Sequence, residues 1–214
     1  MRLFLATRND GKLAEMRRIL VAGVEVVGLD AVAPYDEPVE DRPTFEGNAL
    51  LKARAGLTAT GLPSVADDSG LCVDALNGMP GVLSARWSGL PKSDARNNDL
   101  LLAQLADVPD ERRGAYFACA VAFCHPDGTE AVVRGEMRGR VVREARGSGG
   151  FGYDVLFEAD EAPGVTTAEL TPADKDAISH RGKALREIGP LIAAALSPRA
   201  GGGTRTRTPE GTET

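Results

Sequence analysis

The chain has 214 residues, of which 43% are hydrophobic and 26% are charged, and its formal net charge is −6. This composition is typical of a globular protein that is long enough to bury a core without disulfides or structural metals. The negative charge argues against nucleic acid or an anionic membrane as the main partner, because both attract basic surfaces.

The first third of the chain alternates between strand-like and helix-like segments. In chain order we expect a strand at 2–7, a helix at 12–20, a strand at 24–29, a proline-rich acidic loop at 33–43 and a helix at 44–61. Leu13, Met16 and Leu20 fall on one face of the first helix. Such alternation predicts an α/β domain.

The second expected helix has a recognisable start and one polar face. Thr44 is a candidate N-cap, because its hydroxyl can accept a hydrogen bond from a main-chain N–H of the first turn. Asn48 and Lys52 lie four residues apart and therefore project from the same side of the helix.

The rest of the chain is richer in strands. We expect strands at 64–68 and 71–76, a turn at 77–81, a helix at 93–108, strands at 115–124 and 129–137, a glycine-rich loop at 147–152, a strand at 153–158, and a helix that starts at 171, or again at 179, and runs to about 196. The late hairpin predicts a mixed sheet rather than a strictly parallel one. Residues 1–197 form one expected domain, and 198–214 are expected to be disordered because they contain few apolar residues.

The cysteines and histidines limit redox and metal chemistry. Cys72, Cys119 and Cys124 lie in apolar runs, so we expect buried free thiols and a cytoplasmic location. No secretory signal or transmembrane stretch occurs in the sequence. The only histidines are His125 and His180, and no Cys-x-x-Cys occurs, so a metal site built from these residue types is not expected.

Two adjacent aspartates, Asp67 and Asp68, are expected to end an apolar strand, directly before Ser69. Open α/β proteins place ligands where strands end. A hard cation such as Mg²⁺, held by one or two carboxylates and by substrate phosphates, would relieve the repulsion between the pair. A carboxylate there could also deprotonate a water molecule. The alternative is a surface turn that carries two solvated acids.

A strand end meets a helix start at residues 7–12, and main-chain N–H groups in such a place point at anions. Lys12 adds a full positive charge. The segment is not a P-loop, because G-x-x-x-x-G-K-[ST] occurs nowhere in the chain. The alternative is a capped helix with a surface lysine.

The glycine-rich loop at 147–152 matches the spacing G-x-G-x-x-G, but a strand rather than a helix is expected to follow, so a dinucleotide fingerprint is not indicated. An aromatic side chain in this loop, Phe151 or Tyr153, could stack on a flat base, and Asp154 could accept its N–H groups. The alternative is a structural loop with a core aromatic residue.

The densest basic patch near an expected helix start comprises Lys175, His180, Arg181 and Lys183. In an acidic chain, such a patch is a candidate anion or base site. The alternative is a solvated helix face.

Five segments, in this order, resemble the motifs of the inosine triphosphate pyrophosphatase family: TRNDGKLAE, TFEGNALLKA, ADDSGLCVDALNGMPGVLSARW, GSGGFGYDVLF and ISHRGKAL. The resemblance covers about residues 3–196. It implies an α/β fold with an elongated mixed β-sheet, flanking helices and two lobes around a central nucleotide-binding cleft. It also implies a homodimer that hydrolyses nonstandard purine nucleoside triphosphates (ITP, dITP and XTP) to the monophosphate and pyrophosphate, so that they are not incorporated into DNA or RNA.

The resemblance also implies roles for individual residues. Asp68 would be the general base and a Mg²⁺ contact, and Glu40 would contribute to the metal site. The substrate-binding residues it implies are Thr7, Arg8, Asn9, Asp10, Gly11, Lys12, Lys52, Ser69, Phe151, Gly152, Tyr153, Asp154, Lys175, His180 and Arg181. Residues 7–12 and Lys52 would bind the phosphates, and the later residues would enclose the base and sugar.

The chain departs from the family pattern at five positions. Val155 and Ala145 stand where the family usually has proline, Thr167 replaces a phenylalanine, and Asp176 and Asp174 replace an asparagine and a glutamate. Two rival functions remain open: a nucleotide sensor without catalysis, and a triphosphatase of modified pyrimidine nucleotides. The presence of Asp68 favours an enzyme over a sensor.

Overall fold

The computed structural model of the chain describes residues 2–19 and 24–197. Its strands and helices are β1 (Arg2–Leu5), α1 (Asp10–Ile19), β2 (Glu25–Val27), α2 (Phe45–Thr60), β3 (Ser64–Val73), α3 (Asp94–Gln104), β4 (Gly114–Cys124), β5 (Glu130–Val141), β6 (Phe157–Ala159), α4 (Pro172–Ile178) and α5 (His180–Leu196). The expectations for Leu20 and for 198–214 lie outside the described residues. Within them, no helix is both long and apolar enough to cross a lipid bilayer.

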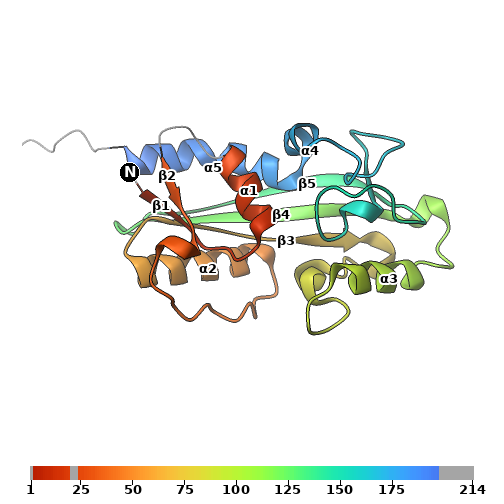
Figure 1. Ribbon diagram of the computed structural model, residues 1–214, viewed down its shortest axis with the longest axis horizontal. Helices are drawn as coiled ribbons and strands as arrows, with labels where there is room; N and C mark the ends of the chain where they lie inside the picture. Colours follow the sequence, from red (N-terminus) through yellow and green to blue (C-terminus); the bar gives the residue numbers. More distant parts are fainter. Residues whose placement is uncertain (1, 20–23, 198–214) are drawn as a thin grey trace, which may run out of the picture.

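The described strands form one sheet in the order β2-β1-β3-β4-β5-β6. Strand β1 pairs in parallel with β2 and β3, whereas the β3-β4, β4-β5 and β5-β6 pairs are antiparallel. Helices α1, α4 and α5 cover one face of this sheet, and α2 and α3 cover the other (Figure 1). The predicted α/β fold with a mixed sheet is therefore confirmed.

The long strands β3, β4 and β5 run through two lobes (Figure 1). In the first lobe, one core lies between the sheet and helices α1 and α5, and a second lies between the sheet and α2. In the other lobe, a third core packs α3 against the far ends of the same strands, with Leu101 and Leu105 on Leu71, Phe117 and Met137. The middle of β3 lies where the lobes meet.

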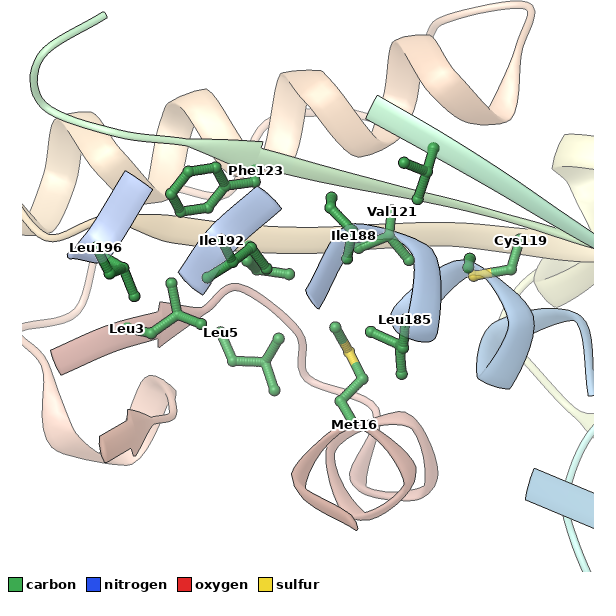
Figure 2. Packing of buried hydrophobic residues seen from close by; sticks show 13 residues of the cluster. Leu3, Leu5, Met16, Cys119, Val121, Phe123, Leu185, Ile188, Ile192 and Leu196 are labelled. Carbon is green, nitrogen blue, oxygen red and sulfur yellow. The ribbon is translucent and has the colours of Figure 1, made fainter. Parts of the chain in front are cut away.

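Figure 2 shows the core on the α1 and α5 face. Met16 of α1 points toward Leu185 and Ile188 of α5, and Leu3 and Leu5 of β1 lie beside them. Met16, predicted on the apolar face of the helix, is fully buried. Burial of a side chain of this size stabilises the fold by about 1.5–3 kcal/mol, so this contact fixes α1 against α5.

Side-chain caps set the starts of the helices, as the sequence predicts. Thr44 accepts a hydrogen bond from the Gly47 N–H at 3.1 Å and begins α2. The C-terminal helix does start twice, because Ser179 adopts an extended conformation, ends α4 and begins α5. Its hydroxyl accepts from the Gly182 N–H at 2.9 Å.

One strand expectation is wrong. Two strands were expected on either side of a break after Asp68, but β3 is continuous from Ser64–Val73 and carries the aspartates in its middle. Its ladder with the apolar strand β4 is uninterrupted, with Asp68 opposite Ala120 and Gly70 opposite Ala118. Gly70 is required there, because a Cβ would lie 2.3 Å from the carbonyl oxygen of Gly81.

The expected strand at 153–158 is also only partly confirmed. Asp154–Leu156 forms a 3-10 turn, and strand β6 begins at Phe157. The Asp154 carboxylate accepts a hydrogen bond from the Phe151 N–H at 2.8 Å, which closes a turn before the strand.

Candidate functional site

A cavity of about 290 Å³ lies where the two lobes meet. The predicted site residues that line it are Thr7, Arg8, Asn9, Lys12, Glu40, Lys52, Asp68, Ser69, Phe151, Gly152, Tyr153, Asp154, Lys175, His180 and Arg181. Asp10 and Gly11 lie in the first turn of α1, and a Cβ on Gly11 would lie 2.7 Å from the Phe151 ring. The structure therefore gathers residues from six segments of the sequence, while their individual roles stay predictions.

The start of α1 combines the two interpretations of residues 7–12. The Asn9 side chain accepts a hydrogen bond from the Lys12 N–H at 3.0 Å, as in a capped helix. The Lys12 side chain is nevertheless only 14% exposed, and its Nζ lies 3.0 Å from Oδ2 of Asp67. Arg8 points to solvent instead and pairs with Glu37.

The side chains of the two adjacent aspartates project from opposite faces of β3, because successive side chains of a strand alternate. Asp67 projects toward α1 and α5, where Oδ2 accepts from Lys12 Nζ at 3.0 Å and from Arg181 Nε at 3.2 Å. Asp68 projects toward α2, where Oδ2 accepts from Asn48 Nδ2 at 3.0 Å. The expected repulsion between neighbours is reduced by this separation.

Asp67 is held as an anion. Its side chain is fully buried, and burial by itself favours the neutral acid. Lys12, Arg181 and Lys52 outweigh that effect and hold the pKa of Asp67 well below its ordinary value. In turn Asp67 helps to raise the pKa of the buried Arg181 above its ordinary value, against the opposing effect of burial. Asp67 and Arg181 therefore both stay charged and form a buried ion pair.

Asp68 has the opposite tendency. Burial raises its pKa, and the partial compensation by Lys52 and Lys12 leaves that pKa above its ordinary value. Lys52 Nζ lies 4.0 Å from Oδ1, and the neighbouring Ser69 N–H donates to the same oxygen at 3.0 Å. A carboxylate that lines a cleft and has a raised pKa is suited to accept a proton.

Lys52 joins Asp68 to Glu40. Its Nζ lies 2.6 Å from Glu40 Oε1. Burial disfavours the ammonium form, but Asp67, Asp68 and Glu40 together raise the pKa of Lys52. Burial likewise disfavours the Glu40 carboxylate, yet Lys52 and Lys12 lower its pKa. The amine therefore stays charged between two carboxylates.

The carboxylates of Asp68 and Glu40 are suitable as part of the ligand set of a Mg²⁺ ion. Among the residues that the structure describes, no three Asp, Glu, His or Cys side chains cluster as metal ligands. Asp68 and Glu40 do line one cleft, and the negative charge of Glu40 contributes to the raised pKa of Asp68. Mg²⁺ typically takes one or two carboxylates and completes its shell with substrate phosphates and water. The pair meets that requirement.

Where α4 and α5 border the cavity, Phe151 lies against two cations. Its ring centroid is 5.0 Å from Lys175 Nζ and 5.6 Å from Arg181 Cζ. His180 stacks on Phe117, with ring centroids 4.9 Å apart. Burial, with Arg181 and Lys175 nearby, holds the pKa of His180 well below its ordinary value, so the imidazole is neutral. This part of the cavity offers stacking surfaces and one neutral ring.

Sequence reasoning missed Glu15. This residue of α1 is 5% exposed and pairs with Lys175 Nζ at 3.2 Å and with Arg181. Lys175 Nζ also lies 2.6 Å from Asp154 Oδ2. One signal was available in the sequence. Glu15 follows Lys12 by three residues within the first motif, so the two side chains are neighbours on the helix surface. Glu15 thus holds the two cations that lie against Phe151.

Ser84, Lys92 and Asp94 also line the cavity and were not predicted. They come from the second lobe, between β3 and the first turn of α3. Ser84 lies within the third motif, but neither that motif nor the sequence around Lys92 and Asp94 indicated a place in the cleft, because only the packing of that lobe brings them there.

Comparison with known proteins agrees with this geometry. The sequence model of the Ham1 family matches residues 3–190. A relative from Nocardia farcinica named dITP/XTP pyrophosphatase is 65% identical, covering 90% of this chain and 95% of the relative. A relative of the same name from Mycolicibacterium paratuberculosis is 60% identical, with coverage of 89% and 95%.

Two solved structures are similar along almost their full length. The Mycobacterium abscessus protein described as nucleoside-triphosphatase / dITP/XTP pyrophosphatase has a TM-score of 0.73 and 55% identity, with 89% of this chain and 100% of that chain covered. The Staphylococcus aureus Ham1 protein has a TM-score of 0.81 and 34% identity, with coverage of 91% and 99%.

Proposed function

The chain belongs to the Ham1 family, and on this premise we propose that it hydrolyses the nonstandard purine nucleoside triphosphates dITP, XTP and ITP to the nucleoside monophosphate and pyrophosphate. One observation carries the proposal: a single cavity is lined by the charged side chains of Asp68, Lys52 and Lys12 and also by the rings of Phe151 and His180. That arrangement suits a triphosphate joined to a flat base. Removal of such nucleotides would keep them out of DNA and RNA.

In the proposed reaction Asp68 takes a proton from a water molecule whose oxygen attacks the α-phosphorus. The bond from the α-phosphorus to the bridging oxygen breaks, and pyrophosphate leaves with the electron pair. Lys12 and Lys52 lie where they would stabilise the negative charge on the phosphate oxygens. Lys175, which the resemblance implies beside the base and sugar, contacts Asp154 and Glu15, and these contacts support that role.

Mg²⁺ dependence is part of the proposal. Asp68 and Glu40 would hold the ion together with the substrate phosphates. When bound, the ion would act as a Lewis acid and neutralise negative charge on the leaving pyrophosphate. The test is activity in excess chelator, which should fall to background and return when Mg²⁺ is added. Full activity in chelator would remove Glu40 from the site.

Selectivity would come from hydrogen bonds at position 6 of the purine. The 6-keto group of inosine and xanthine accepts, whereas the 6-amino group of adenine donates. His180 Nδ1 is buried and has no hydrogen-bond partner among the described residues. The Arg181 guanidinium already donates to Asp67, Glu15 and Ser69. The neutral imidazole of His180 keeps one N–H, so His180, Arg181 or a main-chain N–H group would supply the donor to position 6. An unpaired buried polar group costs about 1–3 kcal/mol, or about 5- to 150-fold in selectivity.

The experiment is a panel of nucleoside triphosphates with product identification. The ratio of kcat/KM for ITP to that for ATP and for GTP should be well above one, with pyrophosphate rather than phosphate released. Ratios near one would contradict the specificity. Binding without turnover would favour the sensor, and preference for modified pyrimidine nucleotides would favour that rival triphosphatase.

We also propose a cytoplasmic homodimer. The sequence resemblance supports the dimer, and the free, buried thiols of Cys72, Cys119 and Cys124 support a reducing compartment. Light scattering on the purified protein tests the assembly, because a monomeric mass at micromolar concentration would contradict it.

A further inference from the structure

The loop that carries Phe151 is anchored by one of its own residues and by helix α3. Within the loop, the Phe151 N–H donates to Asp154 Oδ2 at 2.8 Å. From α3, the Gly152 N–H donates to Asp94 Oδ2 at 2.7 Å, and the Gly152 carbonyl accepts from Asn98 Nδ2 at 3.0 Å. Both main-chain polar groups of a single residue are thus bound by one helix, α3.

This arrangement is more than a helix cap. Ser93 already caps α3 by accepting from the Arg96 N–H. Asp94 and Asn98 lie four residues apart, so they project from the same side of the helix. Both reach across to Gly152, which is more than fifty residues away in the sequence.

We call Asp94 and Asn98, which both bind Gly152, the clamp. The clamp acts where the backbone of the loop is least constrained. Gly150 and Gly152 flank Phe151, with φ values of 71° and 63°, a region in which glycine is free of steric cost. A ring between two such residues would sample many positions without further contacts. The Tyr153 hydroxyl adds a third link by donating to the Ser84 carbonyl at 2.9 Å.

We propose that Asp94 and Asn98 are positioning residues that fix Phe151 at the purine site, so that α3 of the second lobe sets affinity for the base. The inference rests on the proposed function. Phe151 then stacks on the purine from a fixed place beside Gly11, Lys175 and Arg181. Stacking binds substrate and transition state alike, so loss of the clamp raises KM and leaves kcat unchanged.

The test compares Asp94→Ala, Asn98→Ala and Phe151→Ala in steady-state kinetics with ITP. Loss of one such hydrogen bond corresponds to about a fivefold rise in KM. In the Phe151→Ala background, Asp94→Ala and Asn98→Ala should change KM by less than about twofold, because the ring they position is absent. Asp94→Asn keeps an oxygen acceptor and should recover most of the wild-type KM.

The matched control is Asp99→Ala, an exposed acid on the same helix, which should leave KM and kcat unchanged. Thermal unfolding of each variant separates positioning from stability. Equal KM effects with and without Phe151, or a lower kcat and melting temperature at constant KM, would overturn the inference. If Asn98→Ala fails to fold, the exposed Asp94 carries the test. Failure of the wild type to cleave ITP would instead overturn the proposed function, and the inference with it.

Discussion

Asp67 and Asp68 are identical, adjacent and buried residues of one strand, yet their nearest partners differ. Asp67 has two cationic nitrogens within 3.2 Å of one oxygen. The nearest cation to Asp68 lies 4.0 Å away, and its closest side-chain donor is the neutral amide of Asn48. The pKa of Asp67 is therefore lowered, whereas that of Asp68 is raised by burial that its neighbours only partly compensate.

The difference arises from what packs on each face of β3. Helices α1 and α5 bring Lys12 and Arg181 to one face, and α2 brings Asn48 and Lys52 to the other. A charge surrounded by fixed opposite charges holds a structure together, whereas a charge with incomplete compensation can react or bind a cation. Position within the strand thus separates a structural carboxylate from a reactive one.

The largest effect is expected from Asp68→Asn. The change is nearly isosteric, so the fold and melting temperature should persist while the proposed base is lost. We expect kcat to fall by about 10²- to 10⁴-fold, measured as pyrophosphate release from ITP. A variant that turns over within a few fold of the wild type would show that Asp68 is not the base.

Asp67→Asn should instead act mainly on stability. The amide removes the anion between Lys12 and Arg181 and leaves two buried cations without it. We expect the free energy of unfolding in urea to fall by about 2 kcal/mol, whereas Asp68→Asn should not destabilise the protein. Equal losses of stability in the two variants would erase the distinction between the faces.

The smallest effect is expected from Glu40→Gln, which removes the second carboxylate of the Asp68 face. Its side chain is 30% exposed, so packing should survive. The Mg²⁺ concentration for half-maximal activity should rise about 10-fold, as for other residues that support a metal site. Glu46→Gln, at a half-buried acid of α2 that pairs with Arg134, is the control and should leave that concentration unchanged. An unchanged Mg²⁺ requirement in Glu40→Gln would confine metal binding to Asp68.

Local features of the fold could be predicted from the sequence. Thr44 and Ser179 begin helices because a cap needs only a hydroxyl and an N–H three residues later, and both lie in the same short segment. The Met16 face was predicted for the same reason, since helical periodicity is a property of the segment alone. The order of the five motifs likewise indicated the family.

The break expected after Asp68 shows where local reasoning failed. Polar residues and a glycine interrupt an apolar run, and by composition they favour a turn. The strand continues because β4 pairs with every residue from Ser64 to Val73. Whether polar residues end a strand therefore depended on a partner some fifty residues away, which the local pattern does not contain.

The sequence by itself determined which residue types are available: two adjacent carboxylates, several lysines, an aromatic loop and a histidine beside an arginine. Only the tertiary structure decided how they are divided, because Coulomb energies and hydrogen bonds depend on distances between segments far apart in the chain. Arg181 reaches Asp67 across 114 positions and Glu15 across 166. Strand alternation then turns a one-residue step into opposite faces, so that Asp67 binds two cations while Asp68 faces the cleft.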